Sequence, residues 1–201
     1  MVDAILTGAA RILSRARSDT PLAPPEHRPS DRTTPITTNK VAEVAGVSIG
    51  SLYQYFPGKK AILSALLERR LRETYDVLLE RIDRDHAPSL EAAAHALVDA
   101  FVDMKLEHAS VDAGIVEESL RQGLTGDAFA LDDEYTRRFA EVIERWKPEV
   151  RPDLPSDLAA YILFQGLRAL MVIGSFQRPA LLADPRFRVE LVRLVLGWIR
   201  A

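Results

Sequence analysis

The stretch that decides the fold is Thr37–Lys60, with the sequence TTNKVAEVAGVSIGSLYQYFPGKK. Either of its two leading threonines can begin a helix, because a hydroxyl at the N-cap accepts a hydrogen bond from a free backbone N–H group. Gly46 is expected to end that helix, since glycine adopts the left-handed conformation of a C-terminal turn. Ser48 is the N-cap of a second helix, which Pro57 prevents from continuing. The stretch therefore predicts two short helices joined by a tight turn.

The second of these helices, expected over residues 49–55, divides into a core face and an exposed face. Leu52 and Phe56 are spaced four positions apart and should face the core. Gly50 and Ser51 keep the first turn thin, which lets a helix approach base edges in the major groove of DNA. The tyrosines and the glutamine between them fall on the surface that would face DNA. This layout is typical of a helix-turn-helix DNA-binding domain.

These residues closely resemble the N-terminal DNA-binding domain of TetR-family transcriptional regulators. The resemblance rests on the pattern TT..VA..AGVS.GSLYQYF..K, on the residues Ala61, Ile62 and Leu63 after it, and on residues 5–13, which look like the family's first helix. It implies an all-α fold of about nine helices. It also implies a DNA-binding domain over residues 1–60 and a helical effector-binding and dimerisation domain over residues 61–201. Family members bind operator DNA as homodimers and usually release it when a small ligand enters the C-terminal domain.

The resemblance assigns a set of candidate DNA-binding residues. Those expected nearest the bases are Ser48, Ile49, Gly50, Ser51 and Gln54. Those expected at the phosphates are Thr37, Thr38, Tyr53, Tyr55 and Lys59, and Asn39 is a further candidate for DNA contact. The alternative interpretation is an ordinary helical hairpin whose tyrosines pack in a core.

Composition limits the other possibilities. The chain has 201 residues, enough for one large or two small domains, and 47% are hydrophobic, enough for a sizeable core. It has no cysteine, so no disulfide framework or thiolate zinc site is available. No metal-ligand spacing is found among His27, His86, His95 and His108, and there is no phosphate-binding glycine loop or nucleophile motif. We expect no catalytic residue, metal or cofactor.

The sequence also bears on location. No apolar run looks long enough to span a membrane, and the N-terminal residues MVDAILTGAARIL lack the basic start and cleavage signals of a secretory peptide. We therefore expect a cytoplasmic protein with no membrane partner.

Charge is unevenly distributed along the chain. Residues 1–60 carry eight Lys/Arg and five Asp/Glu, a net charge of +3, whereas residues 61–201 carry eighteen and twenty-four, a net charge of −6. A basic head on an acidic body would orient the protein on a polyanion. Chance fluctuation is the alternative for charges this small.

Beyond the motif the pattern predicts helices throughout, with no alternating strand pattern and no repeats. A proline-rich connector is expected over residues 148–155 and a loop between Pro179 and Pro185. Ser156 or Asp157 is the expected cap of the helix after the connector. The expected helices cover residues 59–85, 88–108, 111–124, 128–147, 157–176 and 186–200.

The last two long helices, residues 157–176 and 186–200, are the candidate dimer surface. The first is apolar nearly all round, which indicates burial on more than one side. The second has a broad apolar stripe of Val189, Val192, Val195, Leu196 and Ile199. In the TetR family such helices pair with their copies, and dimerisation doubles the base pairs that one short helix can contact. A purely intramolecular core is the alternative.

A family ligand pocket would lie between the middle helices and residues 157–176. The candidate lining residues are Phe101, Met104, His108, Val116, Leu120, Phe139, Ile143, Trp146, Phe164, Gln165 and Arg168. The apolar ones are equally explained as core, whereas Arg168 could hold a ligand carboxylate or an acidic group across a dimer. Glu117 and Glu118 could face a cationic ligand or form a solvated face. The pattern favours an apolar or amphipathic effector.

One segment departs from the family. Residues 17–36, RSDTPLAPPEHRPSDRTTPI, hold five of the chain's twelve prolines and are longer than most ordered connections. The segment could be a disordered loop, an arm that brings Arg28 and Arg32 to DNA, or a disruption that weakens the DNA-binding head.

The sequence as a whole, through its helix-turn-helix motif, favours a ligand-responsive repressor. An enzyme lacks motif support, and a helical dimer that acts through a protein partner is supported only by this insert.

Overall fold

The computed structural model describes residues 1–18, 36–84, 87–123 and 129–200. Within these ranges every regular element is a helix, apart from one isolated antiparallel bridge between Val150 and Arg200. The all-α expectation is therefore confirmed. The chain forms two compact units, one made of Met1–Leu71 with His108–Ala128 and the other of Arg72–Glu107 with Phe129–Ala201. The expected domain boundary at residue 60 stays a prediction.

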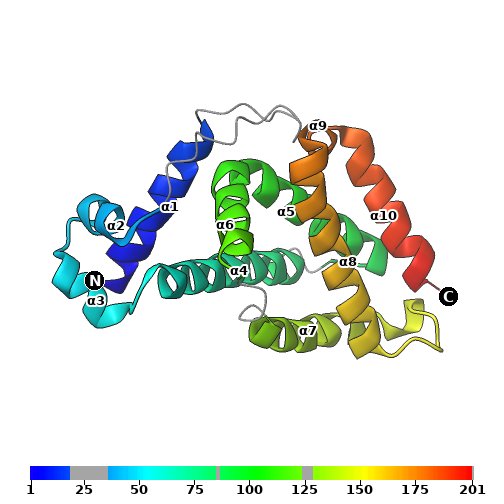
Figure 1. Ribbon diagram of the computed structural model, residues 1–201. Helices are drawn as coiled ribbons and strands as arrows, with labels where there is room; N and C mark the ends of the chain where they lie inside the picture. Colours follow the sequence, from blue (N-terminus) through cyan, green and yellow to red (C-terminus); the bar gives the residue numbers. More distant parts are fainter. Residues whose placement is uncertain (19–35, 85–86, 124–128, 201) are drawn as a thin grey trace. The chain divides into compact units, whose positions relative to one another are not determined.

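The first unit holds the two short helices that the sequence predicted. Helix α1 packs against both α2 and α6, and α3 comes directly after α2 (Figure 1). The helices of this unit are α1 (Val2–Ser18), α2 (Thr38–Ala45), α3 (Ile49–Tyr55), the first part of α4 (Lys59–Arg84) and α6 (Ala109–Arg121).

Local capping sets the bounds of α2 and α3 as expected. The hydroxyl of Thr37 accepts a hydrogen bond from the backbone N–H of Lys40 at 3.2 Å. Gly46 ends α2 with a φ of 69°, a left-handed conformation that glycine adopts without the steric penalty other residues carry. The hydroxyl of Ser48 accepts from the N–H of Ser51 at 3.0 Å and begins α3. Each cap satisfies a backbone group that would otherwise lack a partner.

An apolar core joins these helices. Leu52 of α3 is fully buried together with Val41 of α2 and Leu63 of α4. Helices α1 and α2 meet closely because Gly8 has no side chain: a Cβ there would lie 3.1 Å from the backbone nitrogen of Ala45. The buried residues of this core are Ile5, Leu6, Ala9, Ile12, Leu13, Ile36, Val41, Ala42, Leu52, Phe56, Ile62, Leu63, Leu66 and Ile115.

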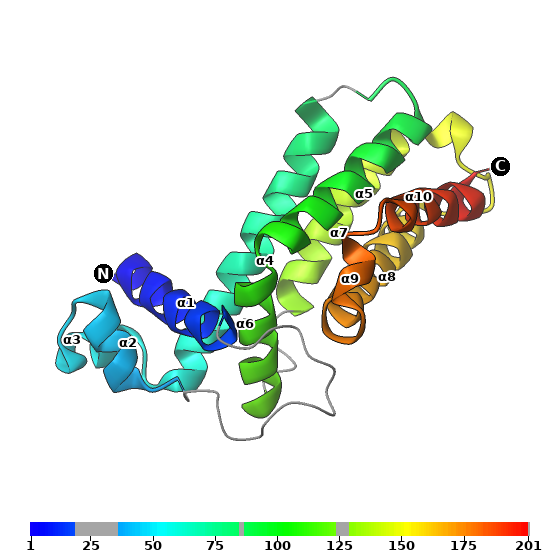
Figure 2. The ribbon, with the colours of Figure 1, turned by 90° about the horizontal axis from the view of Figure 1, so that it is seen from above.

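The second unit is built around α8. Helix α7 packs along α8, while α5 lies against both α8 and α10 (Figure 2). The ring of Phe164 on α8 packs against Tyr75, with ring centres 4.5 Å apart, and against Phe139, at 5.0 Å. The elements of this unit are the rest of α4, α5 (Leu90–Glu107), α7 (Phe129–Glu144), the 3₁₀ turn η2 (Lys147–Glu149), α8 (Ser156–Gln177), α9 (Pro179–Leu182) and α10 (Pro185–Ile199).

Two local expectations in this unit are wrong. The residues after Pro179 form the short helix α9 rather than a loop, because proline suits the first position of a helix. Helix α8 is preceded by Pro155 as its N-cap, with no side-chain cap, and not by Ser156 or Asp157. The described residues hold ten α-helices, α9 included, which agrees with the expectation of about nine.

The expectation that no apolar run is long enough for a membrane span is also wrong. In the described part of the chain, the helical segment Ser156–Gly174 is long enough and apolar enough to cross a membrane, judged by length and composition. One such helix is weak evidence for a membrane span. Its exposed apolar side chains suit an interface between proteins equally well.

Candidate DNA-binding surface and ligand pocket

Helix α3 divides into buried and exposed faces as its sequence predicts. Leu52 is fully buried, whereas Ile49, Tyr53 and Tyr55 are 40%, 51% and 50% exposed. Gln54 is exposed as well. The tyrosines therefore do not pack in the core, and the interpretation as an ordinary hairpin with buried tyrosines is excluded.

The start of α3 leaves room for a close approach by another molecule. A Cβ added at Gly50 would meet only the hydroxyl oxygen of Ser48, at 3.8 Å. Glycine is therefore not needed here for packing within the chain. Because Ser51 is only partly buried and its hydroxyl lies 2.8 Å from that of Ser48, the first turn of α3 offers small polar groups and free space. A helix of this kind can lie close to base edges.

The N-terminus of α2 is connected to the exposed face of α3. The hydroxyl of Thr38 lies 3.2 Å from that of Tyr53, within hydrogen-bonding distance. Asn39 is exposed beside it. The free N–H groups of a helix N-terminus attract phosphate, so this corner brings together two of the expected phosphate-binding residues, Thr38 and Tyr53.

Lys59, another expected phosphate-binding residue, has a partner within the chain. Its ammonium group donates a hydrogen bond to a carboxylate oxygen of Glu118 at 3.1 Å. The Glu118 side chain is only 6% exposed, and Arg121 and Gln122 contact it too. The interpretation of Glu118 as part of a solvated face is therefore wrong, since α6 turns this acid inward towards α4.

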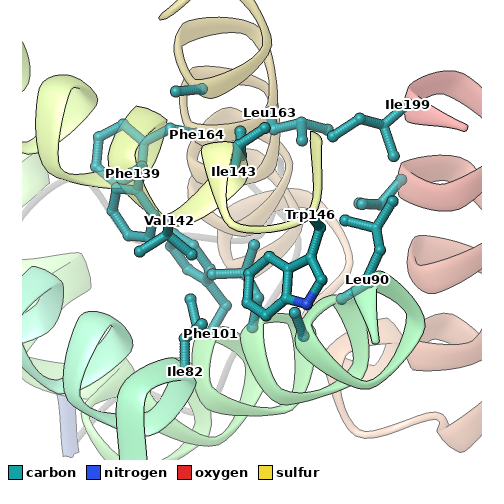
Figure 3. A pocket seen from close by; sticks show the side chains of 15 residues that line it. Ile82, Leu90, Phe101, Phe139, Val142, Ile143, Trp146, Leu163, Phe164 and Ile199 are labelled. Carbon is teal, nitrogen blue, oxygen red and sulfur yellow. The ribbon is translucent and has the colours of Figure 1, made fainter. Parts of the chain in front are cut away.

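The second unit contains an apolar pocket (Figure 3). It holds about 530 Å³ of space between atoms, part of it open to solvent. Aromatic rings of Phe101, Phe139, Trp146 and Phe164 form much of its wall. The full lining is Ile82, Leu90, Ala93, Ala94, Leu97, Phe101, Phe139, Val142, Ile143, Trp146, Ala160, Leu163, Phe164, Val195 and Ile199.

The structure brings together only part of the expected ligand site. Of the candidates, the three phenylalanines, Ile143 and Trp146 line the pocket. Met104, Gln165 and Arg168 belong to the same unit but not to the lining, and His108 belongs to the other unit. The side chains of Leu120 and Val116 lie outside the described residues. The sequence candidates did not include the lining residues Ile82, Leu90, Val195 and Ile199. A periodic pattern of apolar residues looks the same whether the side chains line a pocket or fill a core.

Arg168 lies in a buried polar cluster rather than in the pocket. Its guanidinium donates to a carboxylate oxygen of Asp132 at 2.9 Å and to the hydroxyl of Tyr75 at 3.2 Å. Gln165 donates to the other oxygen of Asp132 at 3.0 Å. Burial raises the pKa of the Tyr75 hydroxyl well above its usual value, although Arg168 counteracts this, and the Asp132 carboxylate raises the pKa further. Arg168 thus has an acidic partner of its own.

Helices α8 and α10 expose a set of large apolar side chains. On α10, Val192, Val195 and Ile199 are buried inside the unit, so most of the expected apolar stripe belongs to the chain's own core. The exposed side chains, which we call the α8/α10 face, are Leu158, Tyr161, Ile162, Leu170, Ile173, Val189 and Leu194.

No group of three or more His, Cys, Asp or Glu side chains in the described ranges could hold a metal ion.

Comparison with known families places two models on this chain. The model described as "Bacterial regulatory proteins, tetR family" matches residues 34–66, which include α2, α3 and the start of α4. The model described as "Tetracyclin repressor-like, C-terminal domain" matches residues 89–198, more than half of the chain. Both describe regulators rather than enzymes.

Individual proteins are more distant. The nucleoid occlusion factor SlmA of Glaesserella parasuis is 31% identical over 110 residues, 54% of this chain and 49% of that protein. The chain thus spans about half the length of this curated relative. Among solved structures, the fatty acid degradation regulator FadR from Bacillus halodurans superposes with a TM-score of 0.65 at 20% identity over 100% of both chains. The ketosteroid regulator KstR2 of Mycobacterium tuberculosis has a TM-score of 0.52 at 21% identity, over 100% of this chain and 95% of that one. At these identities the likeness concerns the fold alone.

Proposed function

Because this chain belongs to the TetR family of transcriptional regulators, we propose that it is a ligand-responsive repressor. It binds a palindromic operator as a homodimer and leaves it when a small apolar or amphipathic effector binds.

The observation that carries the proposal is the exposed face of α3. Ile49, Tyr53 and Tyr55 are exposed although they are large, and Gly50 has open space beside it. A short capped helix with small residues in its first turn and hydroxyls farther along suits a major groove and the phosphates at its edges. In this assignment Ser48, Ser51 and Gln54 contact bases, while Thr37, Thr38 and Tyr53 contact phosphates.

Support for the homodimer comes from the α8/α10 face. Soluble monomers rarely expose large apolar patches, and seven large apolar side chains are exposed on these two helices. Self-association would cover these side chains and present two copies of α3 to successive major grooves, which matches the symmetry of a palindromic operator.

Support for an effector comes from the pocket in the second unit. Its apolar lining and aromatic walls are typical of small-molecule sites. Helix α4 supplies residues to both compact units, the first up to Leu71 and the second from Arg72. We propose that an effector in the pocket biases the position of α4 and thereby the spacing of the two DNA-binding heads.

The test is a titration of the purified protein with its own upstream intergenic DNA and with a scrambled duplex, across a series of salt concentrations. The proposal requires tight binding to the intergenic duplex only, with an affinity that falls steeply as salt rises. Equal affinity for both duplexes calls for a genome-wide selection of bound fragments. If that selection also recovers no preferred sequence, the repressor function is refuted.

The alternative is a helical dimer with impaired DNA binding that acts through a protein partner. It depends on the insert at residues 17–36, most of which lies outside the described residues. The exposed face of α3 disfavours it, because an unused face would not need to keep its tyrosines in solvent.

A further inference from the structure

The pocket in the second unit has a lining of unusual chemical uniformity. None of its fifteen lining residues carries a charge, and fourteen of them have side chains made only of carbon and hydrogen. Burying an ionised carboxylate or ammonium against such a wall costs several kcal/mol or more unless a partner compensates its charge. The lining therefore selects against charged ligands.

The polar cluster next to this wall does not supply such a partner. Phe164 lines the pocket, and its ring also packs on Tyr75. Behind Tyr75, Arg168 is held by Asp132 at 2.9 Å, and Arg168 is not part of the lining. The one guanidinium that the sequence suggested as a carboxylate anchor is thus neutralised inside the chain.

One lining residue carries a polar atom in its side chain. The indole nitrogen of Trp146 is the one non-carbon atom among the lining side chains (Figure 3). Within the described ranges it makes no hydrogen bond, and Trp146 is only partly buried. An indole N–H is a donor and cannot accept. Its natural counterpart in a ligand is a carbonyl, ether or ester oxygen.

We propose that the pocket takes an uncharged, hydrocarbon-rich molecule whose single acceptor oxygen receives the N–H of Trp146. This inference rests on the proposed function and narrows the class of effector. The effector proposed above is apolar or amphipathic, and the lining adds that it carries no charge. Acids with the same hydrocarbon tail are poor ligands of this site.

The experiment compares matched ligands by isothermal titration calorimetry of the full-length protein at pH 7.5. The probes are 2-nonanone, which is neutral and has one acceptor, nonanoate, which is charged, and n-butylbenzene, which has no acceptor. We expect 2-nonanone to bind more than about tenfold tighter than nonanoate, because the lining cannot compensate a charge. Equal or tighter binding of nonanoate overturns the proposal.

Two tryptophan variants test the hydrogen bond. Trp146→Phe keeps an aromatic ring but removes the donor, and it should weaken 2-nonanone binding about two- to tenfold, the usual range for one neutral hydrogen bond. Binding of n-butylbenzene should not change. The matched control is Trp198→Phe, because Trp198 lies outside the lining and contacts Arg151 instead. If both variants affect 2-nonanone equally, Trp146 is not the donor.

A third variant locates the binding site. Leu163→Trp adds bulk at a partly buried wall position and should abolish binding of both 2-nonanone and n-butylbenzene. Unchanged binding would place the ligands elsewhere and refute the site. Leu97→Trp serves the same purpose from α5 if the first variant does not fold. The intergenic duplex is titrated with each preparation, so that loss of the pocket chemistry is distinguished from loss of the DNA-binding function.

Discussion

Lys59 is engaged within the chain before any DNA is present. Its ammonium group contacts the carboxylate of Glu118 at 3.1 Å, and that acid is almost completely buried. A phosphate and Glu118 would therefore compete for the same cation. The strength of DNA binding should depend on this acid although it lies on α6, away from the sequence motif.

Two substitutions test this competition. Lys59→Ala should weaken binding to every duplex alike and lower the log–log salt slope by about one per subunit, because one phosphate contact is lost. Glu118→Gln should strengthen binding about two- to fivefold by releasing Lys59, an effect in the range of an ion pair of which one partner, Lys59, is still 29% exposed. Fluorescence anisotropy at several salt concentrations measures both.

The matched control for Glu118→Gln is Glu117→Gln. This neighbouring substitution changes the net charge equally, but Glu117 pairs with Arg121 and its side chain is 32% exposed. If Glu117→Gln strengthens DNA binding as much as Glu118→Gln does, the gain reflects overall charge and not release of Lys59. A Lys59→Ala protein with altered sequence preference would contradict the phosphate role.

Asp132 has a structural role at the same scale. Its carboxylate accepts hydrogen bonds from Tyr75, Gln165 and Arg168, and the residue is only 3% exposed. Asp132→Asn leaves the Arg168 charge without its partner and should lower the free energy of unfolding by about 2–4 kcal/mol. Urea denaturation measures the change. Asp133→Asn is the control, because Asp133 is the exposed neighbour, and this variant should leave the midpoint of urea denaturation unchanged. If the two variants have the same midpoint, Asp132 does not have the structural role assigned to it.

At the scale of elements, α8 and α10 each have two apolar faces with different uses. One face of each packs within the unit, through Phe164 and Met171 on α8 and Val195 and Ile199 on α10. The other forms the α8/α10 face. Together with the buried face, this exposed face explains why α8 is apolar enough to resemble a membrane span. The homodimer proposed above would cover the exposed face.

Ile173→Asp should disrupt the dimer, because it places a charge in the middle of a surface that would otherwise be buried. Ile173 is 51% exposed in the single chain, so the fold itself should tolerate the change. We expect a monomer by sedimentation velocity and at least about tenfold weaker operator binding, the size of a typical interface hot spot. Leu106→Asp is the matched control, because Leu106 is 43% exposed on α5 and lies outside the α8/α10 face. If Ile173→Asp stays dimeric, the interface lies elsewhere.

At the scale of the whole molecule, effector response requires that a ligand in the second unit alters the DNA-binding unit. Since the chain has no cysteine, Arg11→Cys provides one labelling site per subunit on the exposed surface of α1. Spin labels at this site in the two subunits should change their separation when 2-nonanone is added, as measured by double electron–electron resonance. An identical distance distribution with and without a ligand that demonstrably binds would end the proposed coupling through α4.

The insert provides the second prediction at this scale. If residues 17–36 act as an arm, cutting out residues 19–34 lowers the affinity for operator DNA because Arg28 and Arg32 lose their contacts. If the segment is only a loop, affinity and salt slope remain those of the full chain. Anisotropy titrations on the intergenic duplex measure the affinity and the salt slope. Arg28→Ala and Arg32→Ala in the full chain are the controls, because they remove the charges without shortening the chain.

The sequence alone determined the features that depend on near neighbours. The caps at Thr37 and Ser48, the left-handed Gly46 and the two faces of α3 depend on residues no more than four positions apart, because helix geometry is local. The all-α fold could be predicted for the same reason. The motif also predicts which residues contact DNA, and these assignments remain predictions.

Only the tertiary structure decided which surface each apolar or charged side chain meets. Periodicity marks Val195 and Ile199 as apolar but does not say whether they face a second subunit or, as here, their own core and pocket. The pairing of Lys59 with Glu118 joins residues 59 positions apart, and that of Arg168 with Asp132 joins residues 36 positions apart. Such partners are chosen by the packing of whole helices, which a local pattern does not encode.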